Sequence, residues 1–401
     1  MRFWRLEFLE KFFIVTAKVQ SLRVLHILGE LKPSGAECML KVGAKVFASN
    51  RICNEILSTG TSQIGSYAST LETVGYPVYH LPFAKSFVVF VRLYKLIRIR
   101  RYDVIHIHSE RASFWYALTA RMAGVLTVVS TVHAIFAFHG WLRIRRMIFR
   151  WLMDRMGVTR VAISKSVQNA EWKYFRSQLR IINNWYDPEE FAPPSDVERR
   201  EVRRQYGLSD QSIAIVSVGN CSDIKNHKVV IEAIASIPKE FPVVYLHVGG
   251  EEAHCPERVL AKKLGVSDNS KFFGQVKNPV SILHASDIFV MPSLSEGFGN
   301  AALEAFAVGL PVILSNAQGL RDFAERFPNI QYATPTADSF RSAILELISL
   351  SPNQRREMCV NYSRIARESF SIENGVAEYA RLYWANQKNN KQPNTNEPTE
   401  I

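Results

Sequence analysis

The chain has 401 residues, of which 47% are hydrophobic and 21% charged, and a formal net charge of +12. This length and composition favour two globular domains with separate cores and exclude a disordered or fibrous chain. We expect no membrane-spanning helix, because no uncharged apolar run approaches ~18 residues. The five cysteines are scattered without a CxxC pair, which favours free thiols in a reducing compartment and offers no zinc site.

Residues 1–20 mix aromatic side chains with both charge signs and lack a small-residue cleavage site. They therefore do not resemble a signal peptide. We interpret them as an N-terminal extension, which is either an aromatic anchor at a membrane interface or an upstream addition that does not order.

Short apolar runs rich in valine and isoleucine alternate with helix-length segments along the rest of the chain. The runs predicted as strands are 23–28, 103–108, 127–133 and 161–164 in the first half, and 213–219, 243–249, 287–292 and 311–315 in the second. Strands of this composition separated by helices predict parallel sheets covered on both faces. The segment 183–201 contains three prolines and reads as a linker between the two sets.

The predicted fold class is therefore α/β, with two Rossmann-like doubly wound domains that face a shared cleft. The predicted divisions are an N-terminal domain at 21–187, a C-terminal domain at 188–370, a helix at 371–387 that crosses back to the N-terminal domain, and a disordered tail at 388–401. Ligands of such sheets bind beyond the carboxyl ends of the strands, so the cleft is the expected site.

The positive charge is concentrated in the first half of the chain. Residues 1–190 contain 27 Lys+Arg and 13 Asp+Glu, a balance of +14, whereas the remaining 22 and 24 give −2. Two segments, 85–101 and 141–160, hold six cations each. In the first segment cations recur every three residues beside an apolar face, which predicts a basic amphipathic helix. The cations are Arg92, Lys95, Arg98 and Arg101, and the predicted apolar face is Phe87, Phe90, Val91, Tyr94 and Ile97.

This basic helix has two main interpretations. It either packs on a sheet with a solvated outer face, or it is drawn to an anionic membrane surface, where each cation contributes about 1 kcal/mol. Nucleic acid is a weaker candidate partner, because no recognition motif accompanies the charge.

The segment SEGFGNAALEAFAVG (295–309) follows a buried strand. Its glycine loop leads into a short helix that Gly309 and Pro311 end, so free backbone N–H groups and the positive end of the helix dipole point into the cleft. Gly297 and Gly299 have no Cβ and allow a close approach of a ligand. The pattern predicts a phosphate site.

Two carboxylates, Glu296 and Glu304, flank this anion site. A carboxylate repels phosphate but accepts hydrogen bonds from vicinal hydroxyl groups. The segment therefore predicts a ligand with phosphate in the middle and hydroxyl-rich groups at both ends, such as a nucleotide sugar.

Several segments resemble, in the same order, those of the retaining glycosyltransferases of the GT-B fold, family 4. The run PSLSEGFGNAALEAFAVGLPVI is similar to the E-x7-E signature of that family. The other segments are PSGAE (33–37), DVIHIHS, STVH (130–133), VAISKSVQ, IINNWYDPEEF and VGNCSDIKNH (218–227). The resemblance covers roughly residues 21–385, and it implies a retaining hexosyltransferase that uses a UDP- or GDP-sugar.

The resemblance also implies roles for the matching positions. Glu304 would bind the ribose hydroxyls, Glu296 the hydroxyls of the transferred sugar, and Lys225 the diphosphate, whose growing charge it would stabilise. The other implied donor contacts are Gly297, Phe298 and Gly299 in the glycine loop, Gly219 and Asn220 in the phosphate loop, Gly35 in the first loop, and His133, which would reach the sugar from the other domain. The implied catalytic set is His133, Lys225 and Glu296.

Each of these residues also has an ordinary structural interpretation. A histidine that ends a strand, such as His133, is more often structural than ligand-binding. Glu304 could simply favour the helix dipole, which is worth about 0.3–1 kcal/mol, and Lys225 taken alone is an ordinary surface lysine.

One position departs from the family. Asn220 stands where an arginine usually follows the glycine of the phosphate loop, which weakens the expected grip on the diphosphate. Either Arg321 or His227 compensates, or activity is lower. Ser34 replaces the first glycine of the usual pair, which is a milder change.

The resemblance implies transfer with retention of the anomeric configuration. No residue stands out as a nucleophile, so we expect front-face attack, in which the departing phosphate helps to deprotonate the acceptor. A glycosidase is the less favoured reading of the two carboxylates, because they flank an anion site rather than two faces of a sugar. No DxD motif occurs in the chain, so we expect no metal site and no cofactor.

The basic N-terminal half favours an anionic or membrane-bound acceptor, such as a polyprenyl-diphosphate-linked saccharide in the assembly of a surface polysaccharide: O-antigen, capsule or exopolysaccharide. The expected location is the cytoplasm, peripheral at the inner face of the cell membrane. Two alternatives remain: a nucleotide-sugar epimerase of the same fold, and a non-catalytic nucleotide-binding subunit of a polysaccharide assembly complex.

Overall fold

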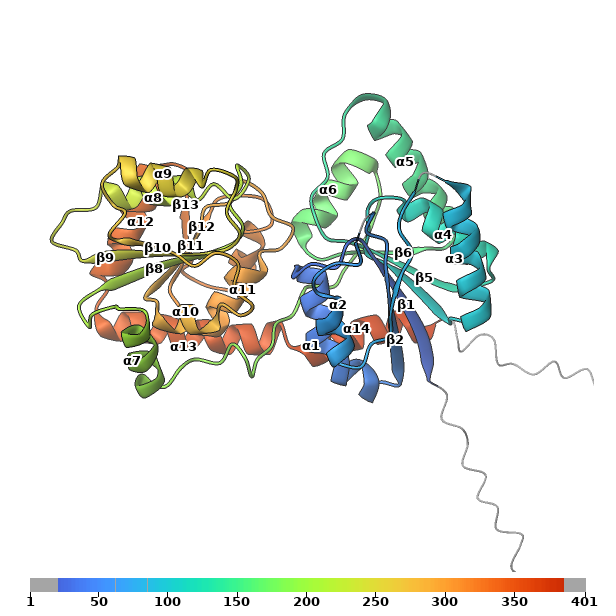
Figure 1. The fold of residues 1–401 in the computed structure, drawn as a ribbon, viewed down its shortest axis with the longest axis horizontal. Coiled ribbons are helices and arrows are strands. Elements are labelled where there is room, and N and C mark those ends of the chain that lie inside the picture. Colours follow the sequence, from blue (N-terminus) through green and yellow to red (C-terminus); the bar gives the residue numbers. More distant parts are fainter. Residues whose placement is uncertain (1–20, 62, 85, 386–401) are drawn as a thin grey trace, which may run out of the picture.

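The computed structural model describes residues 21–61, 63–84 and 86–385. They form two parallel sheets with helices on both faces, placed side by side along the long axis of the molecule (Figure 1). This confirms the predicted α/β class with two Rossmann-like domains. The predictions for residues 1–20 and 388–401 lie outside the described residues.

The N-terminal sheet has seven strands in the order β3-β2-β1-β4-β5-β6-β7, and its paired strands are all parallel. Its elements are β1 (Leu22–Leu28), α1 (Gly35–Ser49), β2 (Ile52–Ser58), α2 (Ala68–Thr73), β3 (Val78–His80), α3 (Phe87–Arg100), β4 (Val104–Ile107), α4 (Ser113–Met122), β5 (Thr127–Val132), α5 (Gly140–Arg155), β6 (Thr159–Ala162), α6 (Lys165–Phe175) and β7 (Arg180–Ile181). The strand order reverses between β1 and β4, and doubly wound sheets bind their ligands at such a switch point.

The C-terminal sheet has six strands in the order β10-β9-β8-β11-β12-β13, again parallel. Its elements are α7 (Asp196–Gln205), β8 (Ile213–Val218), α8 (Lys228–Ala235), β9 (Val243–Val248), α9 (Pro256–Lys263), β10 (Ser270–Phe272), α10 (Val280–Ala285), β11 (Ile288–Met291), α11 (Asn300–Ala307), β12 (Val312–Ser315), the 3-10 helix η1 (Arg321–Glu325), β13 (Gln331–Ala333), α12 (Ala337–Ser349), α13 (Pro352–Ser369) and α14 (Ile372–Ala385). The switch of strand order falls between β8 and β11, beside the glycine loop.

All eight predicted strands are present, and the structure adds β2, β3, β7, β10 and β13. Within β2 the apolar pattern is interrupted by Asn54 and Glu55, which are buried and paired with polar partners from other elements. The prediction of a strand over 161–164 is displaced, because β6 ends at Ala162. Ser164 instead begins α6, where its hydroxyl accepts a hydrogen bond from the backbone N–H of Val167 at 3.1 Å.

The last two helices run along one side of both domains, with α13 under the C-terminal domain and α14 under the N-terminal domain (Figure 1). Val376, Tyr379 and Tyr383 of α14 are buried in the core that α1 and β1 also build. Burying a side chain of this size contributes roughly 1.5–3 kcal/mol. Gly375 makes the packing possible, because a Cβ there would lie 2.1 Å from the Trp185 ring.

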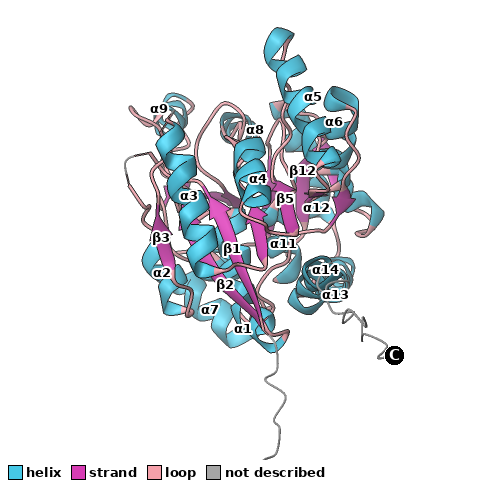
Figure 2. Ribbon diagram, turned by 90° about the vertical axis from the view of Figure 1, so that its right-hand side faces the viewer, coloured by secondary structure: helices cyan, strands magenta, loops and turns pink. Residues whose placement is uncertain are grey.

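The amphipathic helix predicted at 85–101 is α3, but of its predicted apolar face only Ile97 is fully buried. Val89 and Leu93 are buried together with Ile97, whereas Phe87 is 79% exposed. The predicted face was wrong at Phe87 and Tyr94 because apolar residues occupy two sides of this helix, and periodicity does not tell which side meets the sheet. Figures 1 and 2 show α3 beside α4 on the outer face of the sheet.

The second basic segment is only partly a surface feature. Arg150 of α5 and Arg160 of β6 are buried and both contact the Glu171 carboxylate, at 2.7 and 2.5 Å. Arg146 and Arg150 also pair with Glu110. Much of the positive charge in 141–160 is therefore neutralised inside the domain, while Trp141 and other apolar side chains of α5 remain exposed. Of the described helices, none combines the length and the low polarity that crossing a bilayer requires.

Candidate donor pocket between the domains

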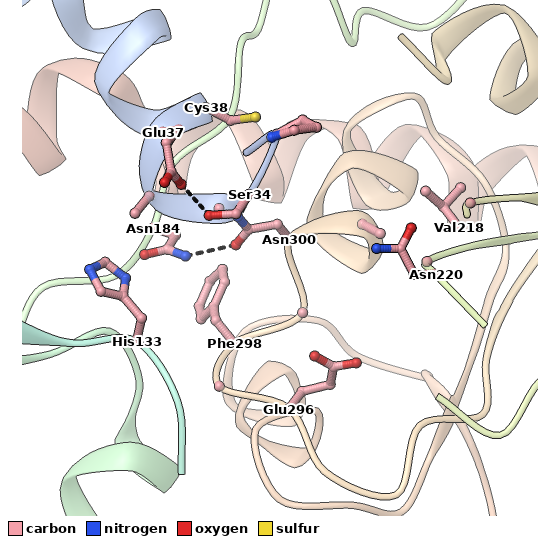
Figure 3. Close-up of a pocket in the computed structure, with 18 of the residues that line it drawn as sticks. Ser34, Glu37, Cys38, His133, Asn184, Val218, Asn220, Glu296, Phe298 and Asn300 are labelled. Carbon is pink, nitrogen blue, oxygen red and sulfur yellow. Dashed lines mark hydrogen bonds between the residues drawn. The ribbon is translucent and has the colours of Figure 1, made fainter. Parts of the chain in front are cut away.

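A pocket of about 760 Å³ lies where the carboxyl ends of the two sheets face each other. It brings together every residue expected at the donor: Gly35, His133, Gly219, Asn220, Lys225, Glu296, Gly297, Phe298, Gly299 and Glu304. Figure 3 shows His133 on one side of the pocket and Asn220 on the other, with Asn300 beside Ser34 between them and Glu296 below. Segments nearly 270 residues apart in the chain thus share one cavity, as facing doubly wound domains require.

The glycines of the loop before α11 serve the protein more directly than the ligand. A Cβ on Gly297 would lie 2.1 Å from the backbone oxygen of His133, across the domain boundary. Gly299 has φ +94° and a Cβ there would meet Leu320 at 2.8 Å. The expectation that these positions lack a Cβ to admit the ligand was therefore incomplete, because the first makes room for the other domain and the second starts the helix in the left-handed region.

Gly35, at the start of α1, also meets the opposite domain. A Cβ there would lie 2.6 Å from Nδ2 of Asn300, the first residue of α11. The Ser34 hydroxyl donates a hydrogen bond to the carboxylate of Glu37 (Figure 3). Ser34 has an extended backbone (φ −127°, ψ 170°), so replacing the usual glycine there requires no strained conformation.

Lys225 and Glu296, expected to act at different parts of the donor, form an ion pair in the pocket. The Lys225 Nζ lies 2.6 Å from Oε1 of Glu296. Their side chains are 29% and 12% exposed, so the pair is partly shielded from water and stronger than a surface salt bridge. A diphosphate entering the pocket competes with Glu296 for this lysine, which is the single Lys or Arg among the described lining residues.

Glu304 lies one turn into α11 and lines the pocket. Burial, together with the nearby charge of Glu190, raises the pKa of its carboxyl group to about 8. Near neutral pH this environment therefore favours the protonated form of the Glu304 carboxyl group. A ligand that supplies hydroxyl donors would stabilise the carboxylate and lower this pKa.

Asn220 is held in one orientation by the next loop. The backbone N–H of Gly250 donates a hydrogen bond of 2.8 Å to Oδ1 of Asn220. Because a backbone N–H only donates, the side-chain NH₂ group is the part of the amide left for a ligand. Figure 3 shows the Asn220 nitrogen on the side that faces Ser34 and Asn300. A neutral donor thus replaces the charged fork of an arginine.

Neither residue expected to compensate for Asn220 does so in this pocket. His227 is buried, and burial with the neighbouring charges of His247 and Lys225 lowers its pKa to about 3, so it is neutral. Arg321 donates hydrogen bonds to Asn316. It is not one of the described residues that line the pocket. Neither residue lines the pocket: the Arg321 side chain is held by Asn316, and His227 is a buried, neutral ring whose nitrogens have no hydrogen-bond partner among the described residues.

Replacing Asn220 with arginine is expected to tighten nucleoside diphosphate binding about three- to tenfold, because a charged hydrogen bond to phosphate is worth about 1.5–3 kcal/mol before losses to solvent exposure. Calorimetric titration with UDP measures the change. Asn220→Gln, which keeps a neutral amide, is the matched variant and should not bind more tightly. Equal affinities for the arginine and glutamine variants would contradict this reading of the loop.

His133 follows β5, and its ring lies beside Phe298 and Asn184 (Figure 3). Its Nε2 is 2.9 Å from Nδ1 of His108. Burial lowers the pKa of His133 to about 4, so the ring is neutral near pH 7. The ring can form one hydrogen bond with a ligand, but it cannot supply a positive charge to a diphosphate.

Sequence reasoning missed the polar contacts that join the two domains. The Asn184 side chain donates to Oδ1 of Asn300 at 2.7 Å, and the Ser164 hydroxyl donates to the backbone oxygen of Gly297 at 2.6 Å. Ser166 bonds both oxygens of Asp322, each at 2.7 Å. The pairs are 116 to 156 residues apart, and no local pattern joins them. The serine-rich turn VAISKSVQ was a usable signal for two of them.

The basic residues expected at a membrane or acceptor lie away from this pocket. Arg92, Lys95, Arg98 and Arg101 are all exposed on α3 or at its end. Beside them an apolar groove of about 480 Å³ runs between α3 and α4. The groove is lined by Ser86, Phe87, Phe90, Val91, Tyr94, Trp115, Leu118, Thr119 and Met122.

Comparisons with known proteins agree with this architecture. The family model described as "Glycosyltransferase Family 4" matches residues 60–190, and the one described as "Glycosyl transferases group 1" matches residues 198–367. The UDP-Gal:alpha-D-GlcNAc-diphosphoundecaprenol alpha-1,3-galactosyltransferase of Escherichia coli is 28% identical over 296 residues, which are 69% of this chain and 76% of that protein.

Solved structures share the fold at low sequence identity. A glycosyltransferase from Rickettsia africae ESF-5 has a TM-score of 0.81 at 18% identity, over 92% of this chain and 99% of that one. Anabaena Alr3699/HepE, solved in complex with UDP and glucose, has a TM-score of 0.78 at 20% identity, over 90% of this chain and 98% of that one. The two family matches, which together span most of both domains, and the paired Rossmann-like sheets show that the chain belongs to the glycosyltransferases of the GT-B fold, family 4.

Proposed function

We propose that this glycosyltransferase transfers a hexose from a UDP- or GDP-sugar, with retention of configuration, to a lipid-linked saccharide in the biosynthesis of a surface polysaccharide. The observation that carries the proposal is the composition of the pocket: one lysine and the start of α11 for a diphosphate, and two carboxylates placed for hydroxyl groups. The Escherichia coli relative is named for a UDP-galactose donor and a diphosphoundecaprenol-linked acceptor, so UDP-sugars are the first donors to test.

Each pocket residue has a proposed task. Glu304 binds the ribose hydroxyls, Glu296 binds hydroxyls of the sugar, and Lys225 stabilises the diphosphate as the bond between the anomeric carbon and the phosphate oxygen breaks. The acceptor hydroxyl attacks the same face that the diphosphate leaves, and its proton passes to a leaving phosphate oxygen. Glu296 is proposed to bind sugar hydroxyls and not to act as a covalent nucleophile.

The reaction is proposed to need no metal ion, because Lys225 supplies positive charge at the diphosphate and the chain has no DxD motif. Turnover is then expected to be unchanged by EDTA. Complete loss of turnover on chelation, with recovery on adding Mn²⁺ or Mg²⁺, would contradict this part of the proposal.

Nucleotide release from a panel of UDP- and GDP-sugars, with and without a membrane lipid extract as acceptor, tests the whole function. We expect release from one donor that depends on the acceptor and is lost in Glu304→Ala. The anomeric coupling constant of the product, measured by NMR, tests retention. If no donor is consumed in the presence of lipid extract, the chain acts as a nucleotide-binding subunit instead.

We further propose that the outer face of α3 and α4 contacts the anionic inner surface of the cell membrane. Exposed cations on α3 stand beside exposed Phe87, Trp115 and Met122, and charge next to exposed aromatic side chains suits the interface of a bilayer. Contact of α3 and α4 with the membrane would bring a lipid-linked acceptor close to the N-terminal domain, which forms one side of the donor pocket.

Neutralising Arg92, Lys95 and Arg98 together by substitution with glutamine is expected to weaken binding to anionic vesicles roughly 100-fold, because each cation contributes about 1 kcal/mol near the surface. Flotation with phosphatidylglycerol vesicles measures the effect, and high salt should weaken wild-type binding in the same way. A matched triple change of the exposed C-terminal-domain residues Lys239, Lys262 and Lys263 should leave flotation unchanged. Wild-type binding that neither salt nor the α3 triple variant reduces would exclude an electrostatic contact.

A further inference from the structure

Histidines from neighbouring strands of the N-terminal sheet form a continuous hydrogen-bonded chain behind the pocket. His26 lies in β1, His108 follows β4 and His133 follows β5. Nδ1 of His26 is 2.9 Å from Nε2 of His108, and Nδ1 of His108 is 2.9 Å from Nε2 of His133. The chain opens at the pocket, which both His108 and His133 line.

The far end of this chain is anchored on a backbone carbonyl. Nε2 of His26 is 3.1 Å from Oδ1 of Asn54, and Nδ2 of Asn54 donates to the Tyr76 hydroxyl at 3.5 Å. The Tyr76 hydroxyl donates to the backbone oxygen of Leu40 at 2.8 Å. Because a carbonyl oxygen only accepts, the single proton of Tyr76 points to Leu40, and its oxygen is left to accept from Asn54.

This anchor sets the direction of every bond as far as the pocket. Asn54 turns its oxygen to His26, so His26 carries its proton on Nε2 and accepts with Nδ1. His108 then donates from Nε2 to His26 and accepts with Nδ1 from Nε2–H of His133. Burial lowers the pKa of His26 and His133 to about 4 and that of His108 well below its usual range, so each ring carries one proton near pH 7.

We propose that Tyr76, Asn54, His26 and His108 are positioning residues that hold His133 as its Nε2–H tautomer and leave Nδ1 as a hydrogen-bond acceptor for the donor. No described residue bonds this Nδ1. The inference rests on the proposed contact of His133 with the transferred sugar. It specifies the group recognised there: a hydroxyl that donates its proton, and not an ether, acyl or phosphate oxygen, which only accept.

A divalent metal is the rival explanation for the cluster, because ligand atoms of His26, His106 and His108 lie within 4.8 Å of one another. Hydrogen bonds, however, engage both ring nitrogens of each of these residues. Nδ1 of His106 is 2.6 Å from the Tyr383 hydroxyl, and its Nε2 is 2.8 Å from the Thr131 hydroxyl. A metal ion would displace several of these bonds, so the geometry favours the hydrogen-bonded chain.

The tautomers are tested in the full-length protein labelled with [15N]histidine, with the ring signals assigned from His26→Gln, His108→Gln and His133→Gln. We expect all three rings to be neutral Nε2–H tautomers from about pH 6 to 8. Two results would overturn the proposal: a His133 ring protonated on Nδ1, or one metal ion bound per protein chain and lost in His26→Gln.

Tyr76→Phe removes the anchor without touching the pocket. It should produce mixed tautomers at His26, His108 and His133 and raise the donor KM about two- to fivefold, because only the correctly protonated fraction binds. Tyr383→Phe is the matched control: it deletes a buried hydroxyl that bonds His106, whose two ring nitrogens bond Tyr383 and Thr131 and not the chain, so it should change neither the His133 tautomer nor KM. Identical spectra for wild type and Tyr76→Phe would overturn the anchoring role.

Donor analogues separate this inference from the proposed donor site. If Nδ1 accepts, replacing the contacted sugar hydroxyl with hydrogen or with fluorine should weaken wild-type turnover by similar factors, since neither substituent donates, and His133→Ala should be insensitive to both. Better turnover of the fluoro analogue than of the deoxy analogue would show that His133 donates, and would overturn the proposal. The spectra do not depend on activity, so they remain decisive even if the donor site is elsewhere.

Discussion

Lys225→Ala is expected to lower kcat/KM for the donor about 10²–10³-fold, mostly through kcat. The lysine is the single Lys or Arg among the described lining residues of the pocket, and charge on the leaving diphosphate grows as the glycosidic bond breaks. Removing one preorganised donor to a developing anion costs a factor of this size in other enzymes. Steady-state kinetics with a saturating acceptor measures the loss.

Two further variants separate this role from structural damage. Lys228→Ala removes an exposed lysine three residues away, which pairs weakly with Asp223 at 3.6 Å, and should leave kcat/KM within twofold. Because Lys225→Ala also leaves Glu296 without its partner, the double variant with Glu296→Gln measures the coupling of the pair. A single variant that keeps at least half of the wild-type kcat would remove Lys225 from the mechanism.

Glu304→Ala is expected to weaken donor binding about 30- to 300-fold, since two charge-assisted hydrogen bonds to the ribose are lost and each is worth about 1.5–3 kcal/mol before compensation by water. Fluorescence or calorimetric titration with UDP measures the affinity. Glu190→Ala changes a nearby carboxylate that does not line the pocket, and it should have a small effect. Equal affinity of wild type and Glu304→Ala would contradict the proposed ribose contact.

Glu304 also makes two opposite predictions about pH. Its folded-state pKa of about 8 lies above the usual value of 4.5, so the folded protein keeps a proton that the unfolded chain releases, and stability falls as pH rises between these values. The Tm of Glu304→Gln should therefore match that of wild type near pH 5 and exceed it by about 2–5 °C near pH 8.5. Donor affinity should instead rise with pH in wild type, as the carboxylate forms, and stay flat in Glu304→Gln.

Local patterns predicted the architecture well. Alternation of valine-rich runs with amphipathic helices was sufficient for eight strands and for the two-sheet fold, because parallel strands must be apolar along their whole length. It missed the short strands β3, β7, β10 and β13, whose two or three residues are too few to show a pattern. It also failed at β2, where buried Asn54 and Glu55 interrupt the apolar run, and at the end of β6. In both places polar side chains are satisfied by partners from distant segments.

In the candidate site, too, local features were predictable and contacts between distant segments were not. Glu296, Gly297, Gly299 and Glu304 are predictable as a unit because they lie on one loop and one helix start. The physical reasons assigned to the two glycines needed the structure, which brings His133 against the first and Leu320 against the second. The buried face of α3 needed it as well, since the helix carries apolar side chains on two sides and only contact with the sheet selects one.

The sequence by itself determined the two parallel α/β domains, and it was enough to propose an anion site at the start of α11 and a nucleotide sugar as the ligand, since these depend on hydrophobic period and on backbone chemistry within a few residues. Only the tertiary structure decided that Lys225 pairs with Glu296, that Asn184 bonds Asn300, and that a chain from Leu40 sets the protonation of His133. Hydrogen bonds and ion pairs act over about 3 Å, and residues far apart in sequence come within that distance only after the two domains have packed.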